Sequence, residues 1–282
     1  MGIKLVAFDM DGTFLNDQNT YDHVRFGQLL SALRARGVRV VAASGSQYQR
    51  LQTQFGDFQK QMDFVSQNGA VVHRGGQPLI VTAMPAAAVT ATLQTIKHQF
   101  QPSEVAEHLV VGVKSAYVDE RMSAASYQQT HYYYDHLKRV PDLAGVTPAR
   151  LDDQITSIGI TFADQVDFST AMTGLRQQLP VGLASQTSGY NTELISMAHV
   201  NKATGLKALM QAYHVQPSEL MTFGDNENDL SMLRLTPHSY AMANAVAAVK
   251  AQAHHLTSSN NADGVLNVLS RLVSGVEDDG AH

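Results

Sequence analysis

The sequence of 282 residues contains no cysteine. This absence excludes disulfide bonds, thiolate metal sites and a cysteine nucleophile. No stretch approaches the roughly 20 apolar residues that a membrane-spanning helix needs. No long apolar segment follows Lys4, so a secretory signal is not expected either. We therefore expect a soluble, cytoplasmic protein with no membrane partner.

An excess of positive charge is also missing. The chain has 20 Lys and Arg residues against 25 Asp and Glu, which gives a formal net charge of −5. A nucleic-acid partner would favour a basic patch, so none is expected. The hydrophobic share of 44% is ordinary for a globular chain and excludes wholesale disorder. The length fits one large or two modest domains, and the oligomeric state cannot be read from it.

Short apolar runs at residues 3–8 and 38–43 flank a stretch, 26–33, whose apolar residues have helical spacing. Such runs are typical of strands that are buried on both faces of a parallel sheet. A further helix is expected after the second run, with a serine of Ser44-Gly45-Ser46 as its N-cap. The alternation of strand and helix predicts an α/β fold with a doubly wound parallel sheet.

A third strand is expected at Asp63–Ser66. After it, Asn68-Gly69 and Gly75-Gly76 mark two turns between short extended pieces. Glycine and asparagine tolerate the backbone conformations of tight hairpin turns. This part of the chain therefore predicts small antiparallel hairpins at the margin of the sheet.

The pattern changes at about residue 83, and extended and helical stretches then alternate up to about residue 190. This segment has the length of a small independent domain. We predict an α/β core made of residues 1–82 and 191–282, and an α+β domain, residues 83–190, that is inserted into it.

Two acidic motifs directly follow apolar strands. They are Asp9-Met10-Asp11-Gly12-Thr13 and Gly224-Asp225-Asn226-Glu227-Asn228-Asp229. Ligands of open α/β sheets bind beyond the carboxyl ends of the strands, so both motifs are expected at one edge of the sheet. Carboxylates brought together repel one another, and a hard divalent cation such as Mg²⁺ offsets this repulsion. Because Mg²⁺ is commonly bound together with a substrate phosphate, the pattern indicates phosphate chemistry.

Two further features fit a phosphate. Ser44-Gly45 lies between a strand and a helix, so its hydroxyl and backbone N–H groups are suited to an anion. Lys202 opens an expected helix, and a lysine is a compact charge for a phosphoryl oxygen. Each residue also has a plainer interpretation, since Ser44 alone fits an N-cap and Lys202 alone fits a solvated surface residue.

Together these motifs resemble those of the haloacid-dehalogenase-like (HAD) hydrolases, and specifically of the Cof-type phosphatases with a large α/β cap. The family's four motifs occur in the expected order, as Asp9 to Thr13, Ser44-Gly45, Lys202, and Gly224 to Asp229. The resemblance covers nearly the whole chain, and the inserted domain lies where the Cof-type cap belongs. It implies a HAD-like core, a cap that sets substrate specificity, and Mg²⁺-dependent hydrolysis of small phosphomonoesters such as sugar phosphates or phosphorylated cofactors.

The resemblance also implies a role for each motif residue. Asp9 would be the nucleophile that forms an aspartyl-phosphate, and Asp11 would transfer protons to the leaving alcohol and from the attacking water. The metal ligands implied by the family are Asp9, Asp11 (through its backbone carbonyl), Asp225 and Asp229. The phosphate-binding residues implied by it are Met10 (through its backbone N–H), Ser44, Gly45, Lys202 and Asn228.

Two local features lie outside this pattern. Members of the family often carry an arginine after the second motif, where this chain has Ser46, so contacts to the substrate are in question there. In the inserted domain, His131 and Asp135 would share a face of a helix at i, i+4 spacing, which leaves a second metal site open. The favoured interpretation of residues 131–136 is a cap helix with aromatic residues that pack inward or line the substrate site.

Rival functions remain open at this point. A phosphotransferase or phosphomutase would use the same aspartyl-phosphate and differ only in the acceptor. A phospho-receiver domain or a non-catalytic phosphometabolite-binding protein would also use an aspartate at a strand end. Taken singly, Asp9 and Asp11 would also fit a simple turn, and Asp225, Asn228 and Asp229 would fit a helix N-cap region.

Overall fold

The computed structural model describes residues 2–187 and 191–275. The chain divides into two compact units, one formed by the residues up to Ile80 and from Asn201 onward, the other by Val81–Val200. Within the described residues, no helix has the length and apolar character needed to cross a membrane.

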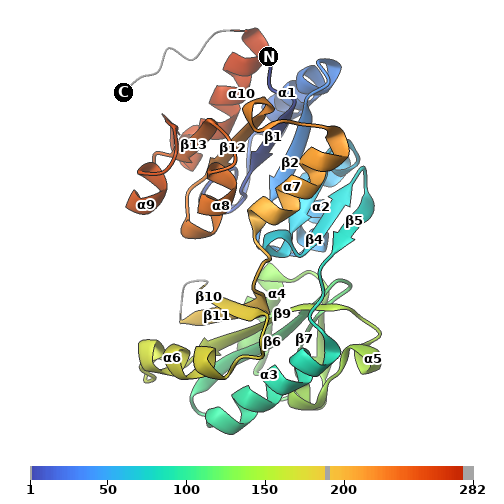
Figure 1. The fold of residues 1–282 in the computed structure, drawn as a ribbon, viewed down its shortest axis with the longest axis vertical. Helices are drawn as coiled ribbons and strands as arrows, with labels where there is room; N and C mark the ends of the chain where they lie inside the picture. The colour runs from blue at the N-terminus through green and yellow to red at the C-terminus, as the bar shows by residue number, and fades with distance from the viewer. Residues whose placement is uncertain (1, 188–190, 276–282) are drawn as a thin grey trace. The chain divides into compact units, whose positions relative to one another are not determined.

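The first unit is an eight-stranded sheet with helices on both faces (Figure 1). Its strands are β1 (Leu5–Phe8), β2 (Arg39–Ala43), β3 (Asp63–Ser66), β4 (Val71–Arg74), β5 (Gln77–Val81), β12 (Leu220–Gly224), β13 (His238–Met242) and β14 (His255–Thr257). Its helices are α1 (His23–Ala35), α2 (Tyr48–Phe55), α7 (Lys202–Tyr213), α8 (Leu230–Leu233), α9 (Ala247–Lys250) and α10 (Gly264–Ser274).

Strand β1 lies inside this sheet, between β2 and β12, in the order β14-β13-β12-β1-β2-β3-β4-β5. The strands from β14 to β3 are parallel to their neighbours, and β4 turns back antiparallel on β3. The prediction of a doubly wound α/β sheet is confirmed, including the antiparallel strands at its margin.

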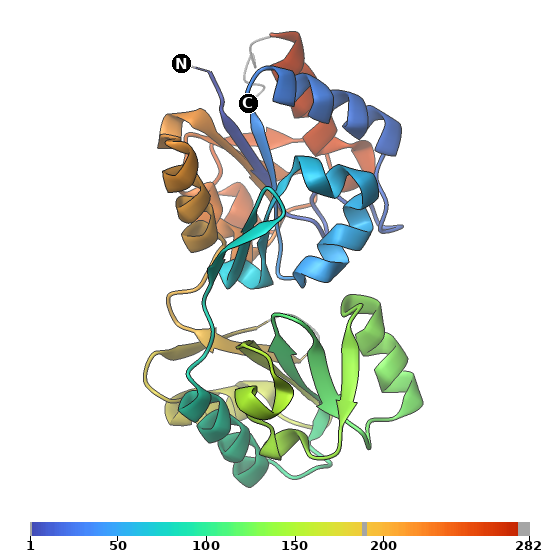
Figure 2. The ribbon, with the colours of Figure 1, turned by 90° about the vertical axis from the view of Figure 1, so that its right-hand side faces the viewer.

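Alternate residues of β1 face opposite layers of helices. Val6 and Phe8 are fully buried in the cluster that includes residues of α1, α2 and α10. Leu5 and Ala7 are fully buried in a second cluster, with Leu206 and Leu209 of α7. Figure 2 shows α1 and α7 on opposite sides of the sheet. Burying a large apolar side chain contributes about 1.5–3 kcal/mol, so β1 is held from both faces.

Helix α2 begins later than the sequence pattern suggested. Its first residue is Tyr48 and its N-cap position is Gln47, so no serine of residues 44–46 caps it. The Ser44 hydroxyl instead accepts a hydrogen bond from the backbone N–H of Ser46 at 3.1 Å, inside the loop. The expectation of a serine N-cap was therefore wrong, because the loop takes one further turn before the helix starts.

The second unit contains a six-stranded sheet in the order β10-β11-β9-β6-β7-β8. Its strands are β6 (Val105–Gly112), β7 (Ala116–Asp119), β8 (Leu137–Val140), β9 (Ile155–Phe162), β10 (Leu183–Thr187) and β11 (Thr192–Met197), and its helices are α3 (Ala86–Gln99), α4 (Ala124–Tyr133), α5 (Pro148–Leu151) and α6 (Phe168–Gln178). Apolar residues of α3 and α6 pack on one face of this sheet, in a core separate from that of the first unit.

The second unit extends beyond the predicted insertion of residues 83–190. Strand β11 pairs antiparallel with β9, so Thr192 to Ser196 belong to the second sheet. The unit ends at Val200, immediately before helix α7. The predicted return to the core at residue 191 differs from this division because the sequence pattern alone does not show which sheet β11 joins.

A close approach fixes the loop after β3 against α7. Gly69 has a φ of +102°, and a side chain there would collide with the backbone carbonyl of Asn201, the N-cap of α7. Only glycine satisfies both the dihedral and the space at this point. The loop of residues 67–69 is therefore locked to the start of the helix that carries Lys202.

We predict that Gly69→Ala destabilises the protein more than Gly76→Ala does. Gly76 also has a positive φ, of +78°, but faces open space, so its substitution costs only the dihedral strain of about 1–2 kcal/mol. Gly69→Ala adds a steric term of about 1–3 kcal/mol. Urea unfolding of both variants measures the difference, and equal losses of stability would contradict the close approach.

Candidate active site

The two acidic motifs meet because β1 and β12 are neighbours. These strands are parallel and in register, with Phe8 opposite Phe223. The backbone N–H of Asp9 donates to the carbonyl oxygen of Phe223 at 3.1 Å, which continues the ladder to the strand ends. The loops that follow the two strands therefore leave the sheet side by side.

Three carboxylates gather where these loops leave the sheet. Asp9, Asp225 and Asp229 each place one carboxylate oxygen within 4.8 Å of the others. Asp9 is 6% exposed and Asp229 is fully buried. In the part of the chain that the structure describes, this is the one group of three or more acidic or histidine side chains with metal-site spacing.

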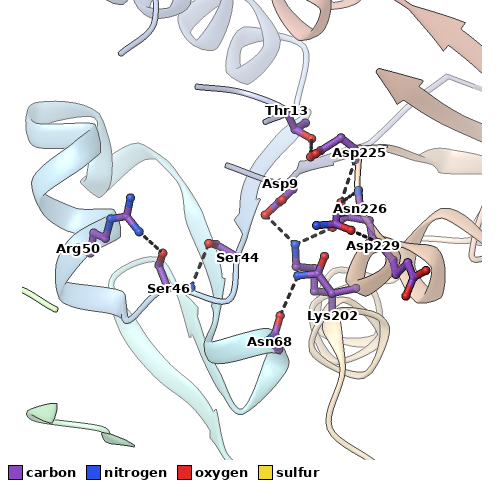
Figure 3. A network of polar contacts seen from close by, with 12 residues as sticks. Asp9, Thr13, Ser44, Ser46, Arg50, Asn68, Lys202, Asp225, Asn226 and Asp229 are labelled. Atoms are coloured by element: carbon purple, nitrogen blue, oxygen red, sulfur yellow. Dashed lines mark hydrogen bonds and ion pairs between the residues drawn. The ribbon is translucent and has the colours of Figure 1, made fainter. Parts of the chain in front are cut away.

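Thr13 and Gly12 join the first motif to the fourth. The Thr13 hydroxyl donates to Oδ1 of Asp225 at 2.6 Å (Figure 3). Gly12 has a φ of +78°, and a Cβ at this position would lie 2.5 Å from Oδ2 of Asp225. The glycine of the first motif therefore makes room for the carboxylate of the fourth.

Lys202 lies at the centre of this cluster. Its side chain is fully buried, and its Nζ lies 2.6 Å from Oδ1 of Asp9 and 2.6 Å from Oδ1 of Asp229 (Figure 3). Helix α7 begins at Lys202, and Asn201 caps it through the backbone N–H of Thr204. The interpretation of Lys202 as a solvated surface residue is thereby ruled out.

Burial and charge shift the pKa values of these groups. Burial raises the pKa of Asp9 well above its usual value, and Asp229 and Asp225 raise it further, while Lys202 acts in the opposite direction. Burial raises the pKa of Asp225 to about 6, against the hydrogen bond from Thr13. Burial alone would lower the pKa of Lys202, but Asp229 and Asp9 raise it on balance, so this amine stays charged.

Asp229 also closes the loop of the fourth motif. Its Oδ2 accepts hydrogen bonds from the backbone N–H groups of Asp225 and Asn226, at 2.9 and 3.1 Å. Asn226 occupies the N-cap position of the 3₁₀ helix Glu227–Asp229. The motif thus begins a short helix whose N-cap is Asn226 and whose capping box is completed by Asp229, while Oδ1 of Asp229 lies 2.6 Å from Nζ of Lys202.

Three of the predicted phosphate-binding residues lie around a residue that the sequence analysis missed, Asn68. The Asn68 backbone N–H donates to the carbonyl of Ser44 at 3.0 Å, and a Cβ on Gly45 would lie 3.3 Å from the Asn68 amide. The side chain of Asn228 donates to Oδ1 of Asn68 at 3.3 Å. Asn68 thus links the second motif to the fourth. It lies two residues after β3, where the sequence pattern predicted only a turn.

The remaining motif residues occupy different surroundings. Asp11 has a side chain that is 51% exposed, and its Oδ1 lies 3.1 Å from Nη2 of Arg50. Met10 is fully buried, and its carbonyl oxygen accepts from the backbone N–H groups of Phe14 and Leu15. The loop of the first motif therefore presents Asp9 inward and Asp11 toward helix α2.

Residues near the C-terminus support the first motif from outside. The Asn244 side chain donates to the carbonyl of Gly12 at 2.7 Å. Its Oδ1 accepts from the backbone of Asn260, whose own side chain donates to the carbonyl of Leu15 at 3.0 Å. Asn244 and Asn260 therefore hold the loop of the first motif in place.

The second metal site considered at His131 and Asp135 is not formed. Helix α4 ends at Tyr133, so Asp135 does not lie one helical turn after His131. The metal-site spacing found among the described residues is confined to Asp9, Asp225 and Asp229. The side chain of Tyr132, in the middle of the aromatic run, lies outside the described residues.

The fold and these motifs define the class of protein. A model of the haloacid dehalogenase-like hydrolases matches residues 6–269. The chain therefore belongs to this family, as its motifs had indicated.

Individual relatives narrow the class to phosphatases. The chain is 32% identical over 273 residues to 5-amino-6-(5-phospho-D-ribitylamino)uracil phosphatase YbjI of Escherichia coli K12, covering 97% of both chains. It is 25% identical to the phosphatase of the same name, YitU, of Bacillus subtilis 168, covering 96% of this chain and 97% of that one. The protein is accordingly a phosphatase of the haloacid dehalogenase-like family.

A solved structure supports the fold described above. The fold is similar to that of SMU.1108c from Streptococcus mutans UA159, with a TM-score of 0.87 and 29% sequence identity. The similarity covers 97% of this chain and all of the other. It therefore includes the inserted unit as well as the sheet that carries the acidic motifs.

We predict that Asp225→Asn stabilises the protein at pH 8 in the absence of divalent cations. The raised pKa of Asp225, about 6, means that the folded state binds this proton more tightly than the unfolded state, where the value is 3.8. The wild-type protein therefore loses about 2–3 kcal/mol of stability as the pH rises from about 4 to 6. The neutral amide in Asp225→Asn does not titrate, so the variant keeps this stability.

Urea unfolding of wild type and variant between pH 4 and 8 measures this effect. The difference in the free energy of unfolding between Asp225→Asn and the wild type should shrink towards zero at pH 4. Asp57→Asn is a matched control because Asp57 is exposed, and no pH-dependent gain is expected from it. Equal stability of the wild type and Asp225→Asn at pH 8 would contradict the electrostatic account.

Proposed function

We propose that the protein is a Mg²⁺-dependent phosphatase that hydrolyses a small phosphomonoester through a phosphorylated Asp9. The observation that supports this most is the cluster of Asp9, Asp225 and Asp229, in which the buried Lys202 pairs with Asp9 and Asp229. A nucleophilic carboxylate needs a fixed position and nearby positive charge before it can attack an anionic phosphate.

The donor set of this cluster fits a magnesium ion. It offers carboxylate oxygens, which hard divalent cations prefer, and the chain contains no cysteine that would favour a softer metal. Three ionised carboxylates and one ammonium group leave two formal negative charges, which one divalent cation balances. Asp9, Asp225 and the backbone carbonyl of Asp11 would hold the ion, with Asp229 beside them. When bound, Mg²⁺ would offset the negative charge that builds up on the phosphoryl oxygens.

In this proposal the chain's own residues divide the reaction into two steps. An oxygen of Asp9 attacks phosphorus, the bond from phosphorus to the alcohol oxygen breaks, and Asp11 gives its proton to that oxygen. Water then attacks the phosphoryl group, Asp11 takes a proton from the water, and the bond between phosphorus and Asp9 breaks to release phosphate. Lys202 keeps Asp9 oriented throughout, from 2.6 Å away.

Binding of the phosphoryl oxygens is assigned to short polar groups around Lys202. They are the Ser44 hydroxyl, the backbone N–H groups of Gly45 and Met10, and the Asn228 amide. Asn68 supports this assignment because it ties the loop of Ser44 and Gly45 to Asn228. Such groups supply donors without adding negative charge next to a dianion.

For the substrate we propose a small metabolite with a phosphorylated sugar or sugar-alcohol chain. The relatives from E. coli and B. subtilis are named for a phosphoribitylamino-uracil, which belongs to this class. We propose in addition that the inserted unit, Val81–Val200, governs substrate selection as a cap domain. A phosphorylated cofactor is the second class to include in an assay panel.

We predict that Asp9→Asn abolishes turnover while the protein stays folded, because a neutral amide is not a nucleophile for phosphorus. A panel of sugar, sugar-alcohol and cofactor phosphates is assayed for release of inorganic phosphate, with and without Mg²⁺. Phosphate release that requires Mg²⁺ in the wild type and disappears in Asp9→Asn is the expected result. Near-native rates in the variant would remove Asp9 from the mechanism.

Analysis of the organic product in the same assay tests the rival phosphotransferase function. A phosphatase releases one inorganic phosphate for each alcohol formed. A transferase would instead produce a second phosphorylated alcohol, with little free phosphate. That outcome would retain the role of Asp9 and reject hydrolysis as the reaction.

We predict that Asp225→Asn raises the Mg²⁺ concentration needed for half-maximal activity by about tenfold or more, since loss of a metal-ligand charge weakens binding. A direct Mg²⁺ titration by calorimetry gives the same comparison without turnover. Asp57→Asn again provides a surface control. An unchanged metal titration in Asp225→Asn would show that the ion does not bind at this cluster.

A further inference from the structure

Arg50, on helix α2, reaches the loop of the first motif. Its side chain is only 8% exposed, and Nη2 lies 3.1 Å from Oδ1 of Asp11. Its Nη1 donates to the hydroxyl of Ser46 at 3.0 Å, one helical turn earlier (Figure 3). The guanidinium group therefore connects Ser46, directly after the second motif, to Asp11 of the first.

The two partners differ in how firmly they are held. Arg50 is buried, and Ser46 fixes one arm of its planar guanidinium group, so few orientations remain for the other arm. The Asp11 side chain is 51% exposed, and an exposed carboxylate on a loop keeps several rotamers open. The ion pair thus transfers the rigidity of α2 to the more exposed carboxylate.

We propose that Arg50 is a positioning residue that holds the Asp11 carboxyl group where it exchanges protons with the leaving alcohol and the attacking water. This inference rests on the proposed function, which assigns the proton transfer to Asp11. Arg50 does not touch the substrate in this proposal. Proton transfer requires a donor within hydrogen-bond reach. A carboxyl group that exchanges among several rotamers is therefore a much less effective acid–base catalyst.

The test uses the dependence on the leaving group. p-Nitrophenyl phosphate releases a stable anion that needs no proton, whereas an alkyl phosphate from the panel releases an alkoxide that does. Since kcat/KM covers substrate binding and the steps up to departure of the leaving group, the difference between its losses for the two substrates isolates this proton transfer. A residue with a merely structural role would lower kcat/KM for both substrates alike.

For Arg50→Gln we expect kcat/KM to fall about 10–100-fold with the alkyl phosphate and less than about threefold with the aryl phosphate. Arg50→Lys keeps the charge but loses the two-armed geometry, so a partial loss of the same kind is expected. Ser46→Ala, which removes the hydrogen bond from Nη1 of Arg50 to the Ser46 hydroxyl, should give a smaller loss in the same direction. Arg34→Gln is the matched control, because Arg34 is exposed on α1, and no loss is expected.

Asp11→Asn separates this inference from the function on which it rests. If Asp11→Asn loses alkyl-phosphate turnover selectively and the Arg50 variants do not, Arg50 has no positioning role and the proposed mechanism stands. If Asp11→Asn keeps its alkyl-phosphate turnover, both assignments fail together. If Arg50→Gln does not fold, as judged by thermal unfolding, Arg50→Lys and Ser46→Ala decide the question. The measured quantity is again the loss of kcat/KM with the alkyl phosphate relative to the loss with the aryl phosphate.

Discussion

The site depends on one buried cation, Lys202, which lies between Asp9 and Asp229 at 2.6 Å from each. A buried ammonium group is tolerated only where carboxylates and hydrogen bonds replace its lost hydration, and a buried carboxylate has the same need of a cation. The three side chains therefore stabilise one another, and removing Lys202 leaves two buried carboxylates without their cation. Because they come from β1, α7 and the turn after β12, this requirement also fixes how those elements meet.

The order of the strands makes the ion cluster possible. Asp9 and Asp225 are more than 200 residues apart in the chain, yet β1 and β12 are direct neighbours in the sheet. Thr13 and Gly12 then accommodate Asp225, and Asn260 supports the loop of the first motif from the far end of the chain. These three residues thus help to determine how closely the carboxylates of the two motifs approach one another.

Sequence reasoning predicted the sheet, the antiparallel margin and the meeting of the two acidic motifs, because each depends on local pattern and on a general rule about strand ends. It did not predict Arg50 or Asn68, since both act through contacts with loops that are distant in the sequence. It ended the insertion near residue 190, because β11 has the composition of a core strand and pattern alone does not say which sheet a strand joins. The serine cap of α2 was wrong because a loop turn and a helix start carry the same residue types.

The central place of β1 has a consequence for how the protein is made. Its neighbour β2 follows after about thirty residues, but its other neighbour, β12, begins only at Leu220. During synthesis at the ribosome, one edge of β1 therefore stays bare until more than three quarters of the chain has emerged. The contiguous segment Val81–Val200 has its own apolar core and is complete before that moment. Assembly of Asp9 with Lys202 and Asp229 is thus among the last events in the synthesis of the chain, and truncated products carry Asp9 without these partners.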